Sequence, residues 1–173
     1  LLPSSFCYKV TNLKTEPLKG QPRTMRLDEA VEFAENPEPR CPCVLLLDTS
    51  GSMQGAPIDA LNEGLEVFRN DLIKDELAKK RVEVAIISFD NNIKVVQDFV
   101  TADQFETPLL TAQVQTHMGA GIQLALEAIA ARKSEYRHTG ITYYRQLVFI
   151  ITAGTPQGET ADDVVILAQR TND

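Results

Sequence analysis

The stretch Val44-Leu45-Leu46-Leu47-Asp48-Thr49-Ser50-Gly51-Ser52 decides the fold expected for this chain. No polar side chain interrupts its four apolar residues, which is typical of a parallel strand buried on both faces. The run ends at Asp48 in a short polar loop, and Pro57 follows at a position that suits the first turn of a helix. The sequence therefore predicts a central buried strand, a loop and a helix, in that order.

Helical and strand patterns alternate in the rest of the chain. Apolar residues at spacings of three and four predict one helix over residues 57–72 and another from Gly119. Strands are expected at 82–89, 93–99 and 147–151, and a last helix from about 160 to 169. This alternation predicts an α/β fold: a Rossmann-like, doubly wound, mostly parallel central sheet flanked by helices.

In such sheets, ligands bind beyond the carboxyl ends of the central strands. Three loops are expected there: one after Leu47, one around Thr116 and one after Thr152. Residues 136–144, which are polar, are instead expected to form a surface loop near the opposite end of the sheet. The predicted chemistry of the chain therefore lies on the three loops.

Residues 1–42 are expected to form an irregular N-terminal arm ahead of a folded domain over residues 43–173. Six prolines interrupt regular structure in this arm: Pro3, Pro17, Pro22, Pro37, Pro39 and Pro42. Within the arm, residues 6–10 have the character of a short edge strand and residues 27–34 that of a short helix. The role of residues 1–24 stays open.

The net charge of −7 comes from 17 basic and 24 acidic residues and argues against nucleic acid or an anionic membrane surface as the main partner. No segment has the roughly 20 apolar residues that a membrane helix needs, and the first residues lack a basic leader. Three cysteines are too few for a disulfide framework and fit a reducing compartment. Together these features predict a cytoplasmic protein.

Cys41 and Cys43 also raise the alternative of a zinc site. A tetrahedral site needs more ligands, and His117 and His138, the two histidines of the chain, show no finger spacing. The favoured interpretation is two ordinary thiols that lead into a strand.

Asp48, Ser50 and Ser52 alternate along the loop, so a tight bend at Gly51 can direct their three side-chain oxygens to one point. One carboxylate and two hydroxyls form an all-oxygen site, which suits Mg²⁺ or Mn²⁺ better than zinc or copper. Such a site leaves coordination positions to water, and a carboxylate of a partner can replace one of these waters.

The stretch Leu46 to Met53 resembles the metal-ion-dependent adhesion site (MIDAS) of von Willebrand factor A domains, and the resemblance extends over about residues 43–170. Its second motif, a threonine ahead of a helix that contains glycine, corresponds to Thr116. The resemblance implies a magnesium or manganese ion held by Asp48, Ser50, Ser52 and Thr116. It also implies a non-enzymatic protein-interaction module that binds a partner's acidic side chain through the metal.

The chain departs from the family pattern at Ala153, where the family usually has an aspartate that supports the metal. Loss of such a residue typically weakens metal binding by about 10–100-fold. Either the chain is a natural variant with reduced metal dependence, or alanine was introduced deliberately to disable the site, and the intact remainder of the motif favours the second.

A second departure is that the family usually has further strands after the last helix. Either these strands are missing, or the N-terminal arm fills the vacant edge, which is the less favoured alternative because only residues 6–10 have strand character. An open sheet edge would permit self-association.

Within the family, Val44 to Pro57 and Thr155-Pro156 resemble the bacterial intracellular TerY-like group, which implies a role in tellurite resistance or a related stress response. Two other functions remain as alternatives. One is a metal-independent scaffold with a degenerate site at Ala153. The other is a serine hydrolase that uses Ser50 or Ser52 with His117, although the chain has no Gly-x-Ser-x-Gly motif.

Overall fold

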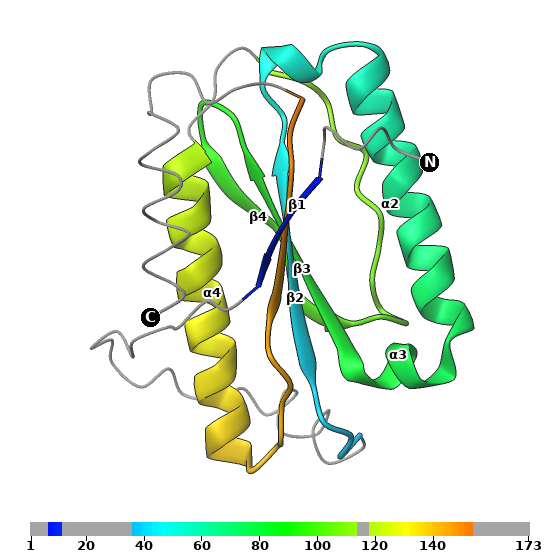
Figure 1. Ribbon diagram of the computed structural model, residues 1–173, viewed down its shortest axis with the longest axis vertical. Helices are drawn as coiled ribbons and strands as arrows, with labels where there is room; N and C mark the ends of the chain where they lie inside the picture. The colour runs from blue at the N-terminus through cyan, green and yellow to red at the C-terminus, as the bar shows by residue number, and fades with distance from the viewer. Residues whose placement is uncertain (1–6, 12–35, 114–117, 154–173) are drawn as a thin grey trace.

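A computed structural model of the chain describes residues 7–11, 36–113 and 118–153 (Figure 1). Its strands are β1 (Cys7–Thr11), β2 (Cys41–Asp48), β3 (Val82–Phe89), β4 (Ile93–Thr101) and β5 (Leu147–Ile151). Its helices are α2 (Ala56–Lys74), α3 (Glu76–Arg81) and α4 (Met118–Thr139), with a short 3₁₀ turn, η1, at Gly51–Met53. The predicted helix at 27–34 and the last helix at 160–169 lie outside the described residues.

The described strands form one sheet in the order β1-β5-β2-β3-β4. The three central strands are parallel, since β2 pairs with both β3 and β5 in that sense. At the two edges, β4 pairs with β3 and β1 pairs with β5 in the antiparallel sense. The predicted α/β architecture is confirmed, with parallel pairing confined to the centre of the sheet.

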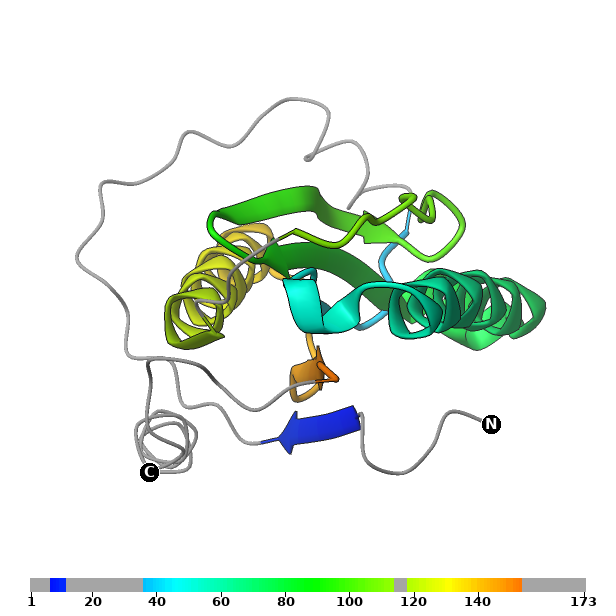
Figure 2. The ribbon, with the colours of Figure 1, turned by 90° about the horizontal axis from the view of Figure 1, so that it is seen from above.

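Alternate residues of the central strands point to the two faces of the sheet and build two separate cores. Val44 and Leu46 of β2 face α4, whereas Leu45 and Leu47 face α2. All four are buried, with exposures of 3% or less. Figures 1 and 2 show the two helices on opposite sides of the sheet. The unbroken apolar run in the sequence is therefore explained by a strand that is covered on both faces.

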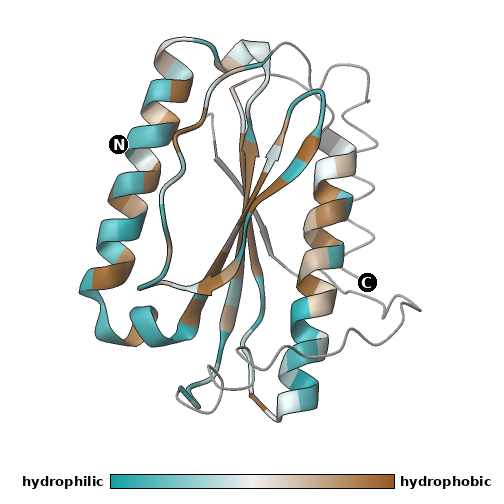
Figure 3. Cartoon of the chain, turned by 180° about the vertical axis from the view of Figure 1, so that it is seen from behind, coloured by the Kyte–Doolittle hydropathy of each residue, from teal (hydrophilic) through white to brown (hydrophobic). Residues whose placement is uncertain are grey.

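Helix α2 follows Gly55, whose φ of 81° lies in a region that suits glycine. The helix buries Ile58, Leu61 and Leu65 against the sheet, and each such side chain contributes about 1.5–3 kcal/mol by leaving water. Figure 3 shows hydrophobic residues along the central strands and mainly hydrophilic ones along α2. The predicted one-sided helix is confirmed.

Helix α4 packs closely against the other face of the sheet. A Cβ at Gly121 would lie 3.2 Å from Leu46 Cδ1 and 3.3 Å from Phe89 Cβ, so glycine permits this approach. Ile122 and Ile129 are buried in this core, and Leu126 is partly buried against it, which agrees with the apolar spacing of the helix predicted from Gly119. None of the described helices is long and apolar enough to cross a membrane.

The N-terminal arm contributes β1, whose residues from Cys7 to Thr11 pair with Ile151 to Leu147 of β5. Of the two alternatives for the edge beside β5, the structure thus shows the one that the sequence favours less. A short strand was the only regular element that residues 1–24 suggested, and the pattern alone gave no partner for it. β2 begins at Cys41, two residues before the predicted boundary at Cys43.

The prediction that residues 136–144 form a polar surface loop is wrong for its first part. Helix α4 continues to Thr139, and Tyr136 is fully buried. The hydroxyl of Tyr136 donates to Glu83 Oε2, and the same carboxylate accepts from Arg40 Nε at 2.8 Å and from Arg132 Nε at 2.7 Å. This polar cluster joins β3, α4 and the start of β2, and so anchors the helix at the end of the sheet opposite the Asp48 loop.

Candidate metal centre

The loop after β2 folds back on the carboxylate with which the strand ends. Asp48 is 1% exposed, and its Oδ1 accepts a hydrogen bond of 2.8 Å from the backbone N–H of Ser50. The turn η1 follows at once, with Met53 N–H donating to the carbonyl of Ser50 at 2.9 Å. Asp48 therefore fixes the direction in which the next residues turn.

This turn brings together the two hydroxyls that the alternating pattern predicts. Ser50 Oγ lies 2.9 Å from Ser52 Oγ, and either hydroxyl can be the donor. Ser50 is buried, whereas Ser52 is exposed. Adjacent ligands of an octahedral Mg²⁺ lie about 3.0 Å apart, because each Mg–O bond is about 2.1 Å long. The spacing of the hydroxyls and the hard oxygen donors thus fit such an ion.

Thr152 is a residue of this centre that the sequence analysis missed. Its Oγ1 donates a hydrogen bond of 2.5 Å to Asp48 Oδ2, and the threonine is 4% exposed. The register explains the contact, since Leu47 pairs with Ile151 and the next residues of β2 and β5 therefore lie side by side. Only a correct pairing of these two strands could have predicted it.

Thr49 anchors the loop to the end of β3 and to the segment before α4. Its Oγ1 donates to Asp90 Oδ2 at 2.9 Å, and its N–H donates to the carbonyl of Phe89 at 3.0 Å. Its own carbonyl accepts from Gln113 N–H at 2.6 Å. Asp90, in the connection between β3 and β4, is thus a buried carboxylate beside the loop. These contacts fix Thr49 between the two candidate ligands Asp48 and Ser50.

Ala153 packs against the apolar cluster on the α2 side of the sheet, which includes Leu47 and Met53. The residue is half-buried and follows Thr152 directly. A methyl group therefore occupies the position at which the family pattern has an aspartate. Among the described residues, no group of three His, Cys, Asp or Glu side chains is placed to hold a metal ion, so the ligands beside Asp48 would have to be hydroxyl oxygens.

Two predicted site residues, Thr116 and His117, lie outside the described residues. The described residues that flank them lie near the candidate centre: Gln113 bonds to Thr49, and α4 starts at Met118 and packs Gly121 against Leu46 and Phe89. The other histidine, His138, lies at the far end of α4, and its Nδ1 is 2.7 Å from the carbonyl oxygen of Ser134. No described histidine therefore approaches Ser50 or Ser52.

The two cysteines of β2 lie at the end of the strand remote from the loop. Cys43 is buried, and burial, followed by the nearby Cys41, raises the pKa of its thiol to about 12. Cys41 is partly exposed, and its Sγ donates to the carbonyl of Arg145 at 3.8 Å. These thiols belong to the core and its margin and take no part in the candidate centre.

The family model described as the von Willebrand factor type A domain matches residues 43–155 of the chain. No curated protein matches the chain. The match begins in β2 and ends two residues beyond Ala153, so it contains every residue of the candidate centre.

Several solved structures are similar to parts of the chain. The von Willebrand factor domain of the type V pili tip protein Mfa5 from Porphyromonas gingivalis is 23% identical, with a TM-score of 0.45, over 54% of this chain and 33% of that one. A structure of three N-terminal domains of Mfa5 is 20% identical, with a TM-score of 0.42, over 72% of this chain and 23% of that one. A variant of the PilB minor pilin from Streptococcus sanguinis is 18% identical, with a TM-score of 0.41, over 64% of this chain and 27% of that one. The chain thus spans a third or less of each of these proteins.

Proposed function

Because the chain belongs to the von Willebrand factor type A domain family, we propose that it is a non-enzymatic protein-interaction module. Domains of this family typically bind other proteins. In this proposal the loop from Asp48 to Ser52 holds Mg²⁺ or Mn²⁺, and an acidic side chain of a partner completes the coordination of the ion. The bound metal supplies a positive centre for that carboxylate.

The observation that carries the proposal is the close approach of two hydroxyls on the turn that directly follows the buried carboxylate of Asp48. Ser50 Oγ and Ser52 Oγ lie 2.9 Å apart, and the N–H of Ser50 is bonded to Asp48 Oδ1. Either hydroxyl can donate to the other, and both oxygens keep at least one lone pair that a cation could use. Asp48 contributes the negative charge, and the exposed Ser52 marks the side from which a partner can approach.

Other residues of the chain hold these ligands in place. The hydrogen bond from Thr152 orients the carboxylate of Asp48, and the contacts of Thr49 with Asp90 and Phe89 fix the backbone between the ligands. Contacts of this kind typically change metal affinity by about 10–100-fold when they are lost. Thr116 remains a proposed fourth ligand, on the strength of the family motif.

A metal-independent scaffold is the second candidate, and the packing of Ala153 favours it. The methyl group lies against the apolar cluster that contains Met53, so the centre has one carboxylate fewer than the family pattern. In that case the protein would bind its partner through surfaces of the fold alone.

Self-association through a sheet edge has less support. At one edge of the described sheet lies β1, whose five residues offer little length for pairing with another strand. At the other, the pairing of β4 with β3 shifts register twice, and Lys94 and Asp98 are exposed on β4. Irregular pairing and charged side chains both hinder the addition of another strand.

The TerY-like assignment, with its role in tellurite resistance or a related stress response, and the cytoplasmic location also remain proposals. They rest on the sequence of the loop region and on the low cysteine count.

The proposal is tested by affinity capture from lysate of the source organism, with the chain immobilised in Mg²⁺ or in EDTA. We expect at least one protein to be retained only with Mg²⁺, and to be lost for the double variant Ser50→Ala/Ser52→Ala. The matched control is Ser134→Ala on α4, remote from the loop, which should retain it.

Recovery of the same proteins by the chain in Mg²⁺, the chain in EDTA, the double variant and the control variant would exclude the metal bridge and support the scaffold. If no protein is captured, calorimetric titration of the purified chain with Mn²⁺ shows the reason. Heat of binding means that the chain binds metal and the lysate lacks the partner, whereas no heat means that the chain does not bind metal.

A further inference from the structure

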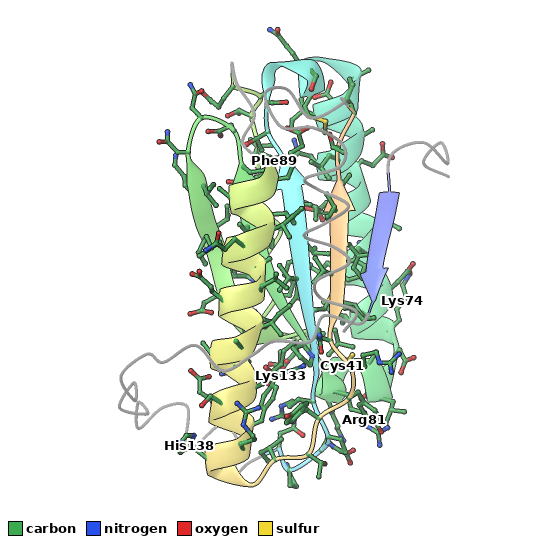
Figure 4. The ribbon with its side chains drawn as sticks, turned by 60° about the vertical axis from the view of Figure 1, so that its left-hand side comes forward. Cys41, Lys74, Arg81, Phe89, Lys133 and His138 are labelled. Atoms are coloured by element: carbon green, nitrogen blue, oxygen red, sulfur yellow. The ribbon has the colours of Figure 1, made fainter. Side chains whose placement is uncertain are left out.

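The end of the sheet opposite the Asp48 loop carries a concentration of basic side chains. Lys79, Lys80 and Arg81 close α3, and Arg137 and His138 lie in the last turn of α4. Figure 4 shows Arg81 and His138 at this end and Phe89 towards the other. The eight-residue strand β2 separates the two ends by roughly 23 Å, at about 3.3 Å per residue.

Two adjacent tyrosines connect the basic ends of the two helices. Arg81 Nη1 donates to Tyr144 Oη at 3.1 Å, and its guanidinium lies 5.8 Å from the centre of the Tyr144 ring. Arg137 Nη1 donates to Tyr143 Oη at 3.3 Å, and Lys133 Nζ lies 5.7 Å from the centre of the Tyr143 ring. We call Lys80, Arg81, Arg137, Tyr143, Tyr144 and Arg145 the basic–aromatic surface.

This surface rests on a rigid support. The segment with the tyrosines runs alongside Arg40, whose N–H donates to the carbonyl of Thr142 at 2.9 Å and whose carbonyl accepts from Tyr144 N–H at 2.7 Å. The side chain of Arg40 is in turn bonded to the buried Glu83. A surface that is ordered before binding loses less conformational entropy when a partner binds.

Few of the described carboxylates offset the positive charge of the basic–aromatic surface. Within the described residues, no carboxylate lies within ion-pair distance of Lys80, Arg137 or Arg145. Arg81 is the exception, since it pairs with Glu38 at 3.0 Å. Burial, and the neighbouring charge of Arg137, lower the pKa of Lys133, as expected where positive charges gather.

Basic residues at the C-termini of helices often do no more than balance the helix dipole. That explanation covers Lys80 and Arg137, but not Arg145 or the two tyrosines, which lie on the segment between α4 and β5. Tyr144 is 47% exposed although its ring is large and largely apolar. Tyrosine and arginine are among the residue types enriched at the energetically important positions of protein interfaces.

We propose that the basic–aromatic surface is a second docking site, which binds an acidic segment of a protein partner independently of any metal. Carboxylates of that segment would pair with Arg137, Arg145 and Lys80, and its backbone or apolar side chains would lie against Tyr144. A short acidic protein segment is favoured over nucleic acid because it can be confined to this surface, whereas a continuous phosphate backbone would extend beyond it and be repelled by a chain of net charge −7.

The test measures fluorescence anisotropy of a fluorescein-labelled oligoglutamate peptide titrated with the full chain in EDTA, so that the Asp48 loop holds no metal. We expect saturable binding that weakens as salt is added. Binding should fall about tenfold in the double variant Arg137→Glu/Arg145→Glu, which equals about 1.4 kcal/mol. Amide chemical shifts should change near residues 79–81 and 137–145.

The matched control is Lys74→Glu/Lys94→Glu, which reverses two exposed charges outside this surface, and it should bind more tightly than the first double variant. Equal loss in both double variants, or no saturation at low salt, would overturn the proposal. Tighter binding of an oligothymidylate than of oligoglutamate would assign the surface to nucleic acid and overturn it too. Because metal is absent throughout, these outcomes are independent of the function proposed for the Asp48 loop.

Discussion

Thr152 Oγ1 donates a hydrogen bond of 2.5 Å to Asp48 Oδ2, and so connects the residue after β5 to the last residue of β2. Both side chains are buried, and Asp48 Oδ1 is bonded to the N–H of Ser50. The carboxylate is therefore held from two directions, by the neighbouring strand and by its own loop. Its orientation depends on residues that are far apart in the sequence.

Replacement of Thr152 by valine removes this hydrogen bond and keeps the shape of the side chain. We expect Mg²⁺ and Mn²⁺ affinity to fall by about 10–100-fold, because Asp48 loses a contact that orients it. Thr152→Ser retains the hydroxyl and should restore most of the affinity. Isothermal titration calorimetry of the three proteins checks this, and equal affinities for the valine and serine variants would contradict it.

Ala153→Asp should raise metal affinity by about 10–100-fold, because it returns a carboxylate to the position of the family aspartate. The same change should lower the free energy of unfolding by about 1–3 kcal/mol without metal, since Ala153 packs against an apolar cluster. Ala153→Asn is the control, because asparagine has the shape of aspartate without its charge. Unchanged calorimetric binding in all three proteins would show that position 153 does not act on the metal.

Glu83→Gln should destabilise the protein by about 3–5 kcal/mol, because it leaves Arg40 and Arg132 without their shared carboxylate in a buried site. Glu38→Gln breaks a half-exposed pair with Arg81 and should cost about 0–1 kcal/mol. Urea unfolding, followed by circular dichroism, measures both. Similar losses for the two variants would mean that burial does not govern the strength of these pairs.

The strand that carries Glu83 shows why part of this fold escaped prediction. Apolar runs and helical spacings correctly indicated β2, β3, β5, α2 and α4, since each pattern reports burial of its own element. Glu83 is fully buried all the same. The arginines that neutralise it are 43 and 49 residues away in the sequence. No local pattern reports such a partnership.

The candidate centre likewise contains residues that a local sequence pattern indicates and residues that it does not. Asp48, Ser50 and Ser52 belong to one turn, and their alternation indicated that their oxygens converge. Thr152 and Asp90 contribute through strand register and a hairpin turn, so their roles became visible only with the strands paired. Thr116 stays a prediction.

Cys43 and Cys41 should differ sharply in reactivity. Burial raises the pKa of the Cys43 thiol to about 12, so at about pH 8 it stays protonated, and only the thiolate reacts with alkylating agents. Cys41 is partly exposed and should react first. Brief treatment of the native protein with iodoacetamide, followed by peptide mass mapping, distinguishes the sites. Equal labelling in native and urea-unfolded protein would contradict the burial of Cys43.

Gly121→Ala should destabilise the protein through the contact between α4 and the sheet. The added Cβ would lie 3.2 Å from Leu46 Cδ1 and 3.3 Å from Phe89 Cβ, closer than ordinary van der Waals contact. Such overpacking costs about 1–3 kcal/mol. Alanine favours a helix over glycine by about 1 kcal/mol. The net loss should be up to about 2 kcal/mol.

A double-mutant cycle with Leu46→Val separates these two effects, because valine removes the Cδ1 atom that the new methyl group would meet. If the contact is the cause, Gly121→Ala should cost less in the Leu46→Val protein than in the original, with a coupling free energy of about 0.5 kcal/mol or more. Denaturant unfolding of the four proteins measures it. Strict additivity would show that α4 shifts to accommodate the methyl group, and that glycine at 121 does not determine how closely the helix lies over β2 and β3.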